Sequence, residues 1–150
     1  MTPSRRHPPV RRALRQAVTV VLRDHPELLR RGIAERTITA HIARHLIRAF
    51  PSWAVDAEYN RRTVVRGGHE ATIPKRVGRD RAIIVPDIII HRRGAPTNLL
   101  AVELKRSSDP RGTAHDRWKL KRLRRMGYAH AVLVVLQDDR EPYRATYEWM

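Results

Sequence analysis

Two acidic residues and one lysine interrupt apolar segments in the middle of the chain. Asp87 lies within the isoleucine-rich segment 83–90, and Glu103 and Lys105 lie at the end of the next apolar segment. Burying an acid among such side chains costs several kcal/mol unless a cation compensates it. Two carboxylates at the end of a sheet form a hard oxygen site that suits Mg²⁺. A lysine beside them can orient or help to deprotonate a metal-bound water, the nucleophile that hydrolysis of a phosphodiester needs.

The two apolar segments, 83–91 and 98–105, are predicted to be neighbouring strands. The turn sequence Arg-Arg-Gly-Ala-Pro separates them and favours an antiparallel hairpin. Because side chains alternate along a strand, Glu103 and Lys105 project from one face and Leu104 from the other, toward a core. Asp87 has to approach Glu103 and Lys105 from the neighbouring strand. The proline before this acid removes one ladder hydrogen bond, so we expect a bulge or a sheet edge there.

The remaining segments predict helices packed on a sheet. Apolar residues recur at helical spacing in some segments, whereas others show the alternation or the continuous burial of strands. The expected elements are helices over 10–23, from Thr37 to Phe50 and over 113–126, and strands over 53–59, 129–136 and 143–149. Residues 61–81 are rich in glycine and basic residues and predict a loose hairpin or an extended loop. The fold class is therefore α/β, an arrangement of helices and sheet in a sandwich.

Large apolar side chains at periodic positions are assigned to the core. The second helix contributes Ile38, Ile42, Leu46, Ile47 and Phe50, the basic helix over 113–126 contributes Trp118, Leu120, Leu123 and Met126, and the first strand contributes Trp53. Asp116 lies on the basic helix and is expected to contact a basic residue of that helix.

Composition and charge limit the classes of protein to which the chain can belong. The chain has 150 residues, no cysteine and a formal net charge of +16. One domain over 10–150, preceded by a mobile basic arm over 1–9, fits this length and pattern. Without cysteine a disulfide-stapled secreted module is excluded, and no apolar run has the roughly 20 residues of a membrane helix. No signal-peptide core follows the basic start, so we expect a cytoplasmic protein without a membrane partner.

The excess of positive charge favours nucleic acid as a partner, because Lys and Arg that neutralise phosphates release condensed counterions. DNA is the expected polymer, and both RNA and a homodimer are left open. The residues expected to contact phosphate lie in the arm, the first helix and the basic helix: Arg5, Arg6, Arg11, Arg12, Lys119, Lys121, Arg122, Arg124 and Arg125.

The order Pro-Asp, 15 further residues and Glu-Leu-Lys, which contains Asp87, Glu103 and Lys105, resembles the PD-(D/E)XK nuclease superfamily. The resemblance covers about 37–136. It implies the restriction-endonuclease-like fold, a mixed sheet flanked by helices, here with an N-terminal helical extension. It also implies hydrolysis of phosphodiester bonds with Mg²⁺, or with Mn²⁺ in its place. Asp87 and Glu103 would be metal ligands, and Lys105 would be the catalytic lysine that assists the attacking water.

The same resemblance implies a third acid near the metal. The segment Val-Asp-Ala-Glu-Tyr-Asn-Arg is similar to one that small bacterial and phage members place before Pro-Asp, which makes Glu58 a candidate catalytic residue and metal ligand. The first acid of the superfamily often lies on the preceding helix instead, where Glu35 is available but stands early in the chain. The alternative function is a basic nucleic-acid-binding or regulatory protein of the same fold that does not hydrolyse its partner.

Overall fold

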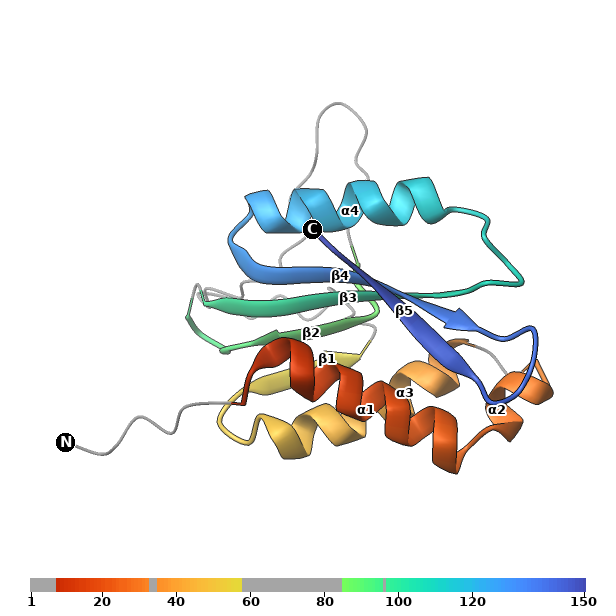
Figure 1. The fold of residues 1–150 in the computed structure, drawn as a ribbon. Helices are drawn as coiled ribbons and strands as arrows, with labels where there is room; N and C mark the ends of the chain where they lie inside the picture. Colours follow the sequence, from red (N-terminus) through yellow and green to blue (C-terminus); the bar gives the residue numbers. More distant parts are fainter. Residues whose placement is uncertain (1–7, 33–34, 58–84, 96) are drawn as a thin grey trace.

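Five strands form one mixed sheet in the computed structural model, which describes residues 8–32, 35–57, 85–95 and 97–150. Neighbouring strands follow the order β1-β2-β3-β4-β5, in which β3 and β4 are parallel and the other pairs are antiparallel. The described elements are α1 (Val10–Asp24), α2 (Glu27–Arg30), α3 (Glu35–Ala49), β1 (Ala54–Ala57), β2 (Ile88–His91), β3 (Asn98–Arg106), α4 (Thr113–Arg125), β4 (Tyr128–Gln137) and β5 (Arg144–Trp149). The expected α/β class, with a mixed sheet flanked by helices and a helix at the N-terminus, is confirmed (Figure 1).

Helices cover the two faces of this sheet (Figure 1). α1 and α3 pack on one face, where alternate strand residues such as Ile88, Val102 and Val134 build the larger apolar core. α4, which connects the parallel strands β3 and β4, packs on the opposite face over a smaller core that includes Ile89 and Leu133. Each face therefore receives every second residue of a strand.

The predicted hairpin of β2 and β3 is confirmed, with one register shift near its turn. β2 begins at Ile88, and residues 85–87, which were predicted to be strand, lie before it. Pro86 has no N–H to give to a ladder, which accounts for the later start. Asp87 nevertheless donates its backbone N–H to the carbonyl of Val102 at 3.0 Å. Asp87 is thus held beside β3 by the chain that leads into β2.

The helices differ from the prediction at a few positions. α3 begins at Glu35, two residues before Thr37, and an acid in the first turn suits the helix dipole. α2 has too few residues to show a periodic pattern, and the sequence does not predict it. Ile47 is 51% exposed, so its assignment to the core was wrong. It lies one residue, or about 100° around the helix, beyond the buried Leu46.

Trp118 was also wrongly assigned to the core. Side chains at i, i+4 and i+7 share one face of a helix, and Asp116, Leu120 and Leu123 are the buried residues of α4. Trp118 lies two residues from Leu120, on the opposite side, and is 40% exposed. Trp53, in contrast, packs partly buried against the larger core.

The last two strands have the environments that their patterns predict. β4 is buried along most of its length, and β5 pairs with β4 alone, at an edge of the sheet described above. Most of the basic arm, Glu58 and the loop over 61–81 lie outside the described residues. Within the described part of the chain, no helix is long and apolar enough to cross a membrane.

Candidate active site

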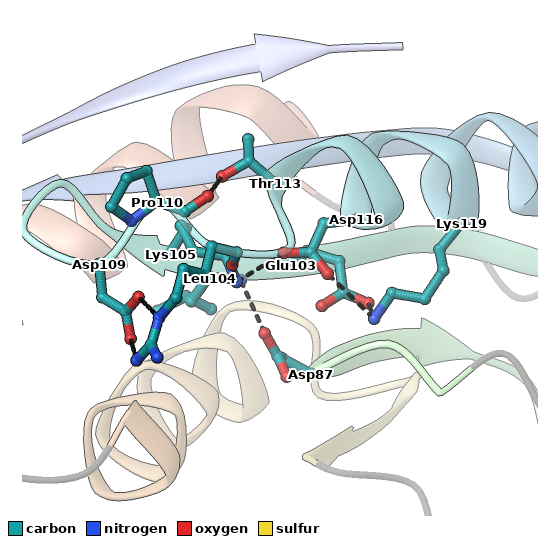
Figure 2. A network of polar contacts seen from close by, with 10 residues as sticks. Asp87, Glu103, Leu104, Lys105, Asp109, Pro110, Thr113, Asp116 and Lys119 are labelled. Carbon is teal, nitrogen blue, oxygen red and sulfur yellow. Dashed lines mark hydrogen bonds and ion pairs between the residues drawn. The ribbon is translucent and has the colours of Figure 1, made fainter.

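Asp87, Glu103 and Lys105 belong to one polar cluster between the sheet and the start of α4 (Figure 2). Glu103 and Lys105 contact residues of α4, whereas Leu104 between them is buried in the larger core on the other face. The alternation predicted for this strand is therefore confirmed.

Asp87 is anchored to the strand that carries the other two residues. Its Oδ2 accepts the backbone N–H of Leu104 at 2.7 Å. Burial raises the pKa of Asp87 above its ordinary value, although the Leu104 N–H, Glu103 and Lys119 oppose this rise. The carboxylate therefore has a fixed position in a poorly solvated place, where its ionised form favours a cation nearby.

Glu103 is a buried acid, only 2% exposed. Burial and the neighbouring Asp87 raise the pKa of Glu103 to about 9, and Lys119 opposes the rise. The Lys119 Nζ lies 2.7 Å from Oε1 of Glu103. Among the described residues, Lys119 is the one that forms an ion pair with Glu103. A divalent cation in place of this ammonium would also lower the pKa of Glu103.

Asp116 joins the cluster from the first turn of α4 and is only 7% exposed. Its Oδ2 lies 2.9 Å from Nζ of Lys105, and its Oδ1 lies 3.3 Å from Nζ of Lys119. The expected contact within its own helix is confirmed, whereas the sequence did not predict the contact with β3. A signal for it was present: Asp116 and Lys119 lie at helical spacing from Leu120 and Leu123, which makes them charged residues on an apolar face.

Lys105 is held inside the cluster rather than in solvent. Besides its ion pair with Asp116, its Nζ donates to the carbonyl of Arg111 at 2.9 Å. Burial disfavours its charge, but Asp116, Glu35 and Asp87 hold the pKa of Lys105 above its ordinary value. The ammonium is therefore charged at neutral pH.

The connection from β3 to α4 positions these side chains. Asp138 accepts the hydroxyls of Ser107 and Ser108 and the backbone N–H of Ser108, which fixes the chain just after β3. Gly112 then precedes α4 with a φ of +77°, a left-handed conformation that suits glycine. A Cβ at Gly112 would lie 3.7 Å from Nζ of Lys105, so the turn passes close to this ammonium.

Glu35 is part of the same electrostatic environment although it stands early in the chain. It is half-buried at the first residue of α3, a helix that contacts β3. Burial raises the pKa of Glu35; Lys105 and the backbone N–H of Arg106 oppose the rise, and Asp87 adds to it. Although Glu35 is far from Asp87 and Lys105 in the sequence, the fold brings it near them because α3 starts at this end of the sheet. Glu58, the other candidate for a third acid, lies outside the described residues.

The basic residues expected to contact phosphate have different environments. Lys119 is only 14% exposed along its side chain and turns toward Glu103 instead of solvent. Arg124 donates to the carbonyls of Tyr128 and Ala129 at 2.5 and 2.6 Å and so ties the last turn of α4 to the start of β4. Arg122 is half-buried, and Arg5 and Arg6 lie outside the described residues. The exposed members of the set are Arg11, Arg12, Lys121, Arg124 and Arg125.

The donor atoms of the cluster fit a magnesium ion. Among the described residues, no group of three or more histidine, cysteine, aspartate or glutamate side chains is arranged to hold a metal ion. Mg²⁺, however, is usually bound through one or two carboxylates, with waters and substrate phosphates completing its shell. Asp87 and Glu103 supply two such carboxylates, and they lie close enough for each to shift the pKa of the other.

Comparisons with protein-family models, with curated proteins and with solved structures give no match to this chain. The chemistry of the cluster therefore follows from its own residues and their geometry.

Proposed function

We propose that the protein is a divalent-metal-dependent nuclease of the PD-(D/E)XK type that hydrolyses phosphodiester bonds in DNA. The observation that carries the proposal is the cluster shared by the buried Glu103 and the half-buried Asp87 and Lys105. Acids with raised pKa values in a buried place cost stability and are typical of functional sites. The net charge of +16 supports a polyanionic substrate.

Each residue has a role in the proposed reaction. Asp87 and Glu103 would hold Mg²⁺ or Mn²⁺, and the bound ion would activate a water and offset charge on the phosphate. Lys105 orients the attacking water and stabilises the charge that develops as its oxygen bonds to phosphorus. The attacking water gives a proton to solvent, the bond from phosphorus to the leaving oxygen breaks, and that oxygen takes up a proton from water, which leaves one phosphate end and one hydroxyl end. Glu35 is our candidate for the third acid because it interacts with Asp87 and Lys105, with Glu58 as the alternative.

The test is cleavage of plasmid, linear, single-stranded and branched DNA with Mg²⁺, with Mn²⁺ or with a chelator. We expect the wild-type protein to cleave at least one substrate only when a divalent ion is present. Asp87→Asn should lower the rate by about a thousandfold, the upper range for loss of one charge-stabilising group. Asp24→Asn is the matched control, because Asp24 is an exposed acid at the end of α1 that pairs with Arg23.

Cleavage that continues in chelator would overturn the proposal. So would a folded Asp87→Asn protein that cleaves as fast as the Asp24→Asn control.

A nucleic-acid-binding protein without hydrolysis is the second candidate, and one observation favours it. The ammonium of Lys119 lies 2.7 Å from Glu103, as it would in an ion pair with a purely structural role. This candidate predicts DNA binding that is independent of divalent ions and no cleavage of any of the four substrates.

A further inference from the structure

Lys119 lies between two buried acids. Its Nζ is 2.7 Å from Oε1 of Glu103 and 3.3 Å from Oδ1 of Asp116 (Figure 2). The side chain is only 14% exposed, so this ammonium is shielded from water. Neither the resemblance nor the proposed reaction gives Lys119 a function.

The two acids are not equivalent partners for this lysine. Glu103 is one of the proposed metal ligands, and a divalent ion on its carboxylate would repel an ammonium that touches the same group. Charges in a poorly solvated place are weakly screened, so this repulsion is strong. Asp116 lies on the same helix as Lys119, and its other oxygen is already engaged by Lys105. Asp116 can therefore keep its ion pair with Lys119 when Glu103 binds another cation.

We propose that Lys119 is an internal cation that competes with the divalent ion for Glu103, and that Asp116 holds its ammonium once the ion has bound. This inference rests on the metal site of the proposed function. In the metal-free protein, the Lys119 ammonium occupies the position beside Oε1 of Glu103 and also pairs with Asp116. Metal binding then requires the ammonium to leave Glu103, so Lys119 is a positioning residue that sets the divalent-ion concentration at which the site fills.

Two variants are expected to change metal affinity in opposite directions. Lys119→Met keeps most of the side-chain volume and removes the competing charge, so Mn²⁺ should bind about tenfold more tightly, within the usual range of coupling between two ligands. Asp116→Asn removes the charge that receives the displaced ammonium, so Mn²⁺ should bind several-fold more weakly. Lys121→Met is the matched control, because Lys121 is an exposed lysine on the same helix, and its Mn²⁺ affinity should stay within about twofold of wild type.

The experiment is a Mn²⁺ titration of the metal-free full chain without nucleic acid, followed by electron paramagnetic resonance of the free ion. Thermal denaturation with and without Mn²⁺ gives a second measurement on the same proteins. Lys119→Met should unfold at a lower temperature than wild type without metal and should gain more from Mn²⁺. If Lys119→Met does not fold, Lys119→Gln replaces it, and Lys119→Arg, which keeps the charge, should bind Mn²⁺ like wild type.

The outcomes separate this inference from the proposed function. The inference is overturned if wild type binds Mn²⁺ and the neutral Lys119 variants bind it equally or more weakly. The proposed metal site would not be affected by that result. Binding by neither wild type nor these variants would overturn both. If only Lys119→Met binds Mn²⁺, the inference is supported, because the ammonium of wild type would then exclude the ion completely.

Discussion

The two faces of strand β3 carry different kinds of side chain. Toward α1 and α3, Leu100, Val102 and Leu104 are buried in a continuous apolar core. Toward α4, Glu103 and Lys105 take the alternate positions and meet charged residues of the helix. Apolar burial is favourable, whereas the burial of charges is costly even when they are paired, so Glu103 and Lys105 add less to stability than the apolar residues of the first face.

A core substitution on β3 should affect stability and leave the chemistry unchanged. Leu100→Ala removes a fully buried side chain on the apolar face and should lower the free energy of unfolding by about 2–5 kcal/mol. Chemical denaturation measures this loss. The cleavage rate per folded molecule should equal that of wild type, and a large fall in that rate would show that the two faces are not independent.

Lys105→Ala should give the opposite result. Loss of the ammonium is expected to lower the single-turnover cleavage rate by about a hundredfold or more, as deletion of one electrostatic donor does. Affinity for Mn²⁺ and for DNA should change far less. A rate within about threefold of wild type at saturating protein and metal would remove Lys105 from the reaction.

The charged face should make stability depend on pH. The pKa of Glu103 is raised to about 9 in the folded, metal-free protein and is near 4.5 in an unfolded chain. Between these values the folded state binds more protons, so the Glu103 contribution falls as pH rises from about 5 to about 9, by at most about 1.4 kcal/mol per pH unit. Urea denaturation across this range should show a steeper decline for wild type than for Glu103→Gln. Parallel curves would contradict the raised pKa.

The smallest effects are expected from exposed basic residues outside the cluster. Lys121→Ala and Arg125→Ala should each lower the slope of log affinity for DNA against log salt concentration by about one. The measurement uses the Asp87→Asn background so that DNA stays intact. Arg30→Ala is the control, because Arg30 is already paired with Glu141. An unchanged slope in the first two variants would exclude them from the phosphate contacts.

The sequence predicted most of the sheet because its strands have strong local patterns. The alternation around Leu104 and the apolar run of β4 depend only on neighbours in the chain, and both are confirmed. Asp116, Lys119 and Glu35 were harder to find because their contacts depend on where α3 and α4 dock. For Asp116 and Lys119, charge on the apolar face of α4 was a usable signal, since such residues need a buried partner. Trp118 shows the opposite error. It was assigned to the core because tryptophan is large and apolar, although its position on the helix leaves it exposed.

The decisive measurement is single-turnover DNA cleavage by wild type and Glu103→Gln, first after chelation and then after Mg²⁺ is restored. Glu103 is chosen because it is both the proposed metal ligand and the partner of Lys119. We expect wild type to be inactive without the ion and to recover with it, while Glu103→Gln remains about a thousandfold slower. Recovery of Glu103→Gln to the wild-type rate, or cleavage by wild type without a divalent ion, would contradict a metal-dependent site on this face of β3.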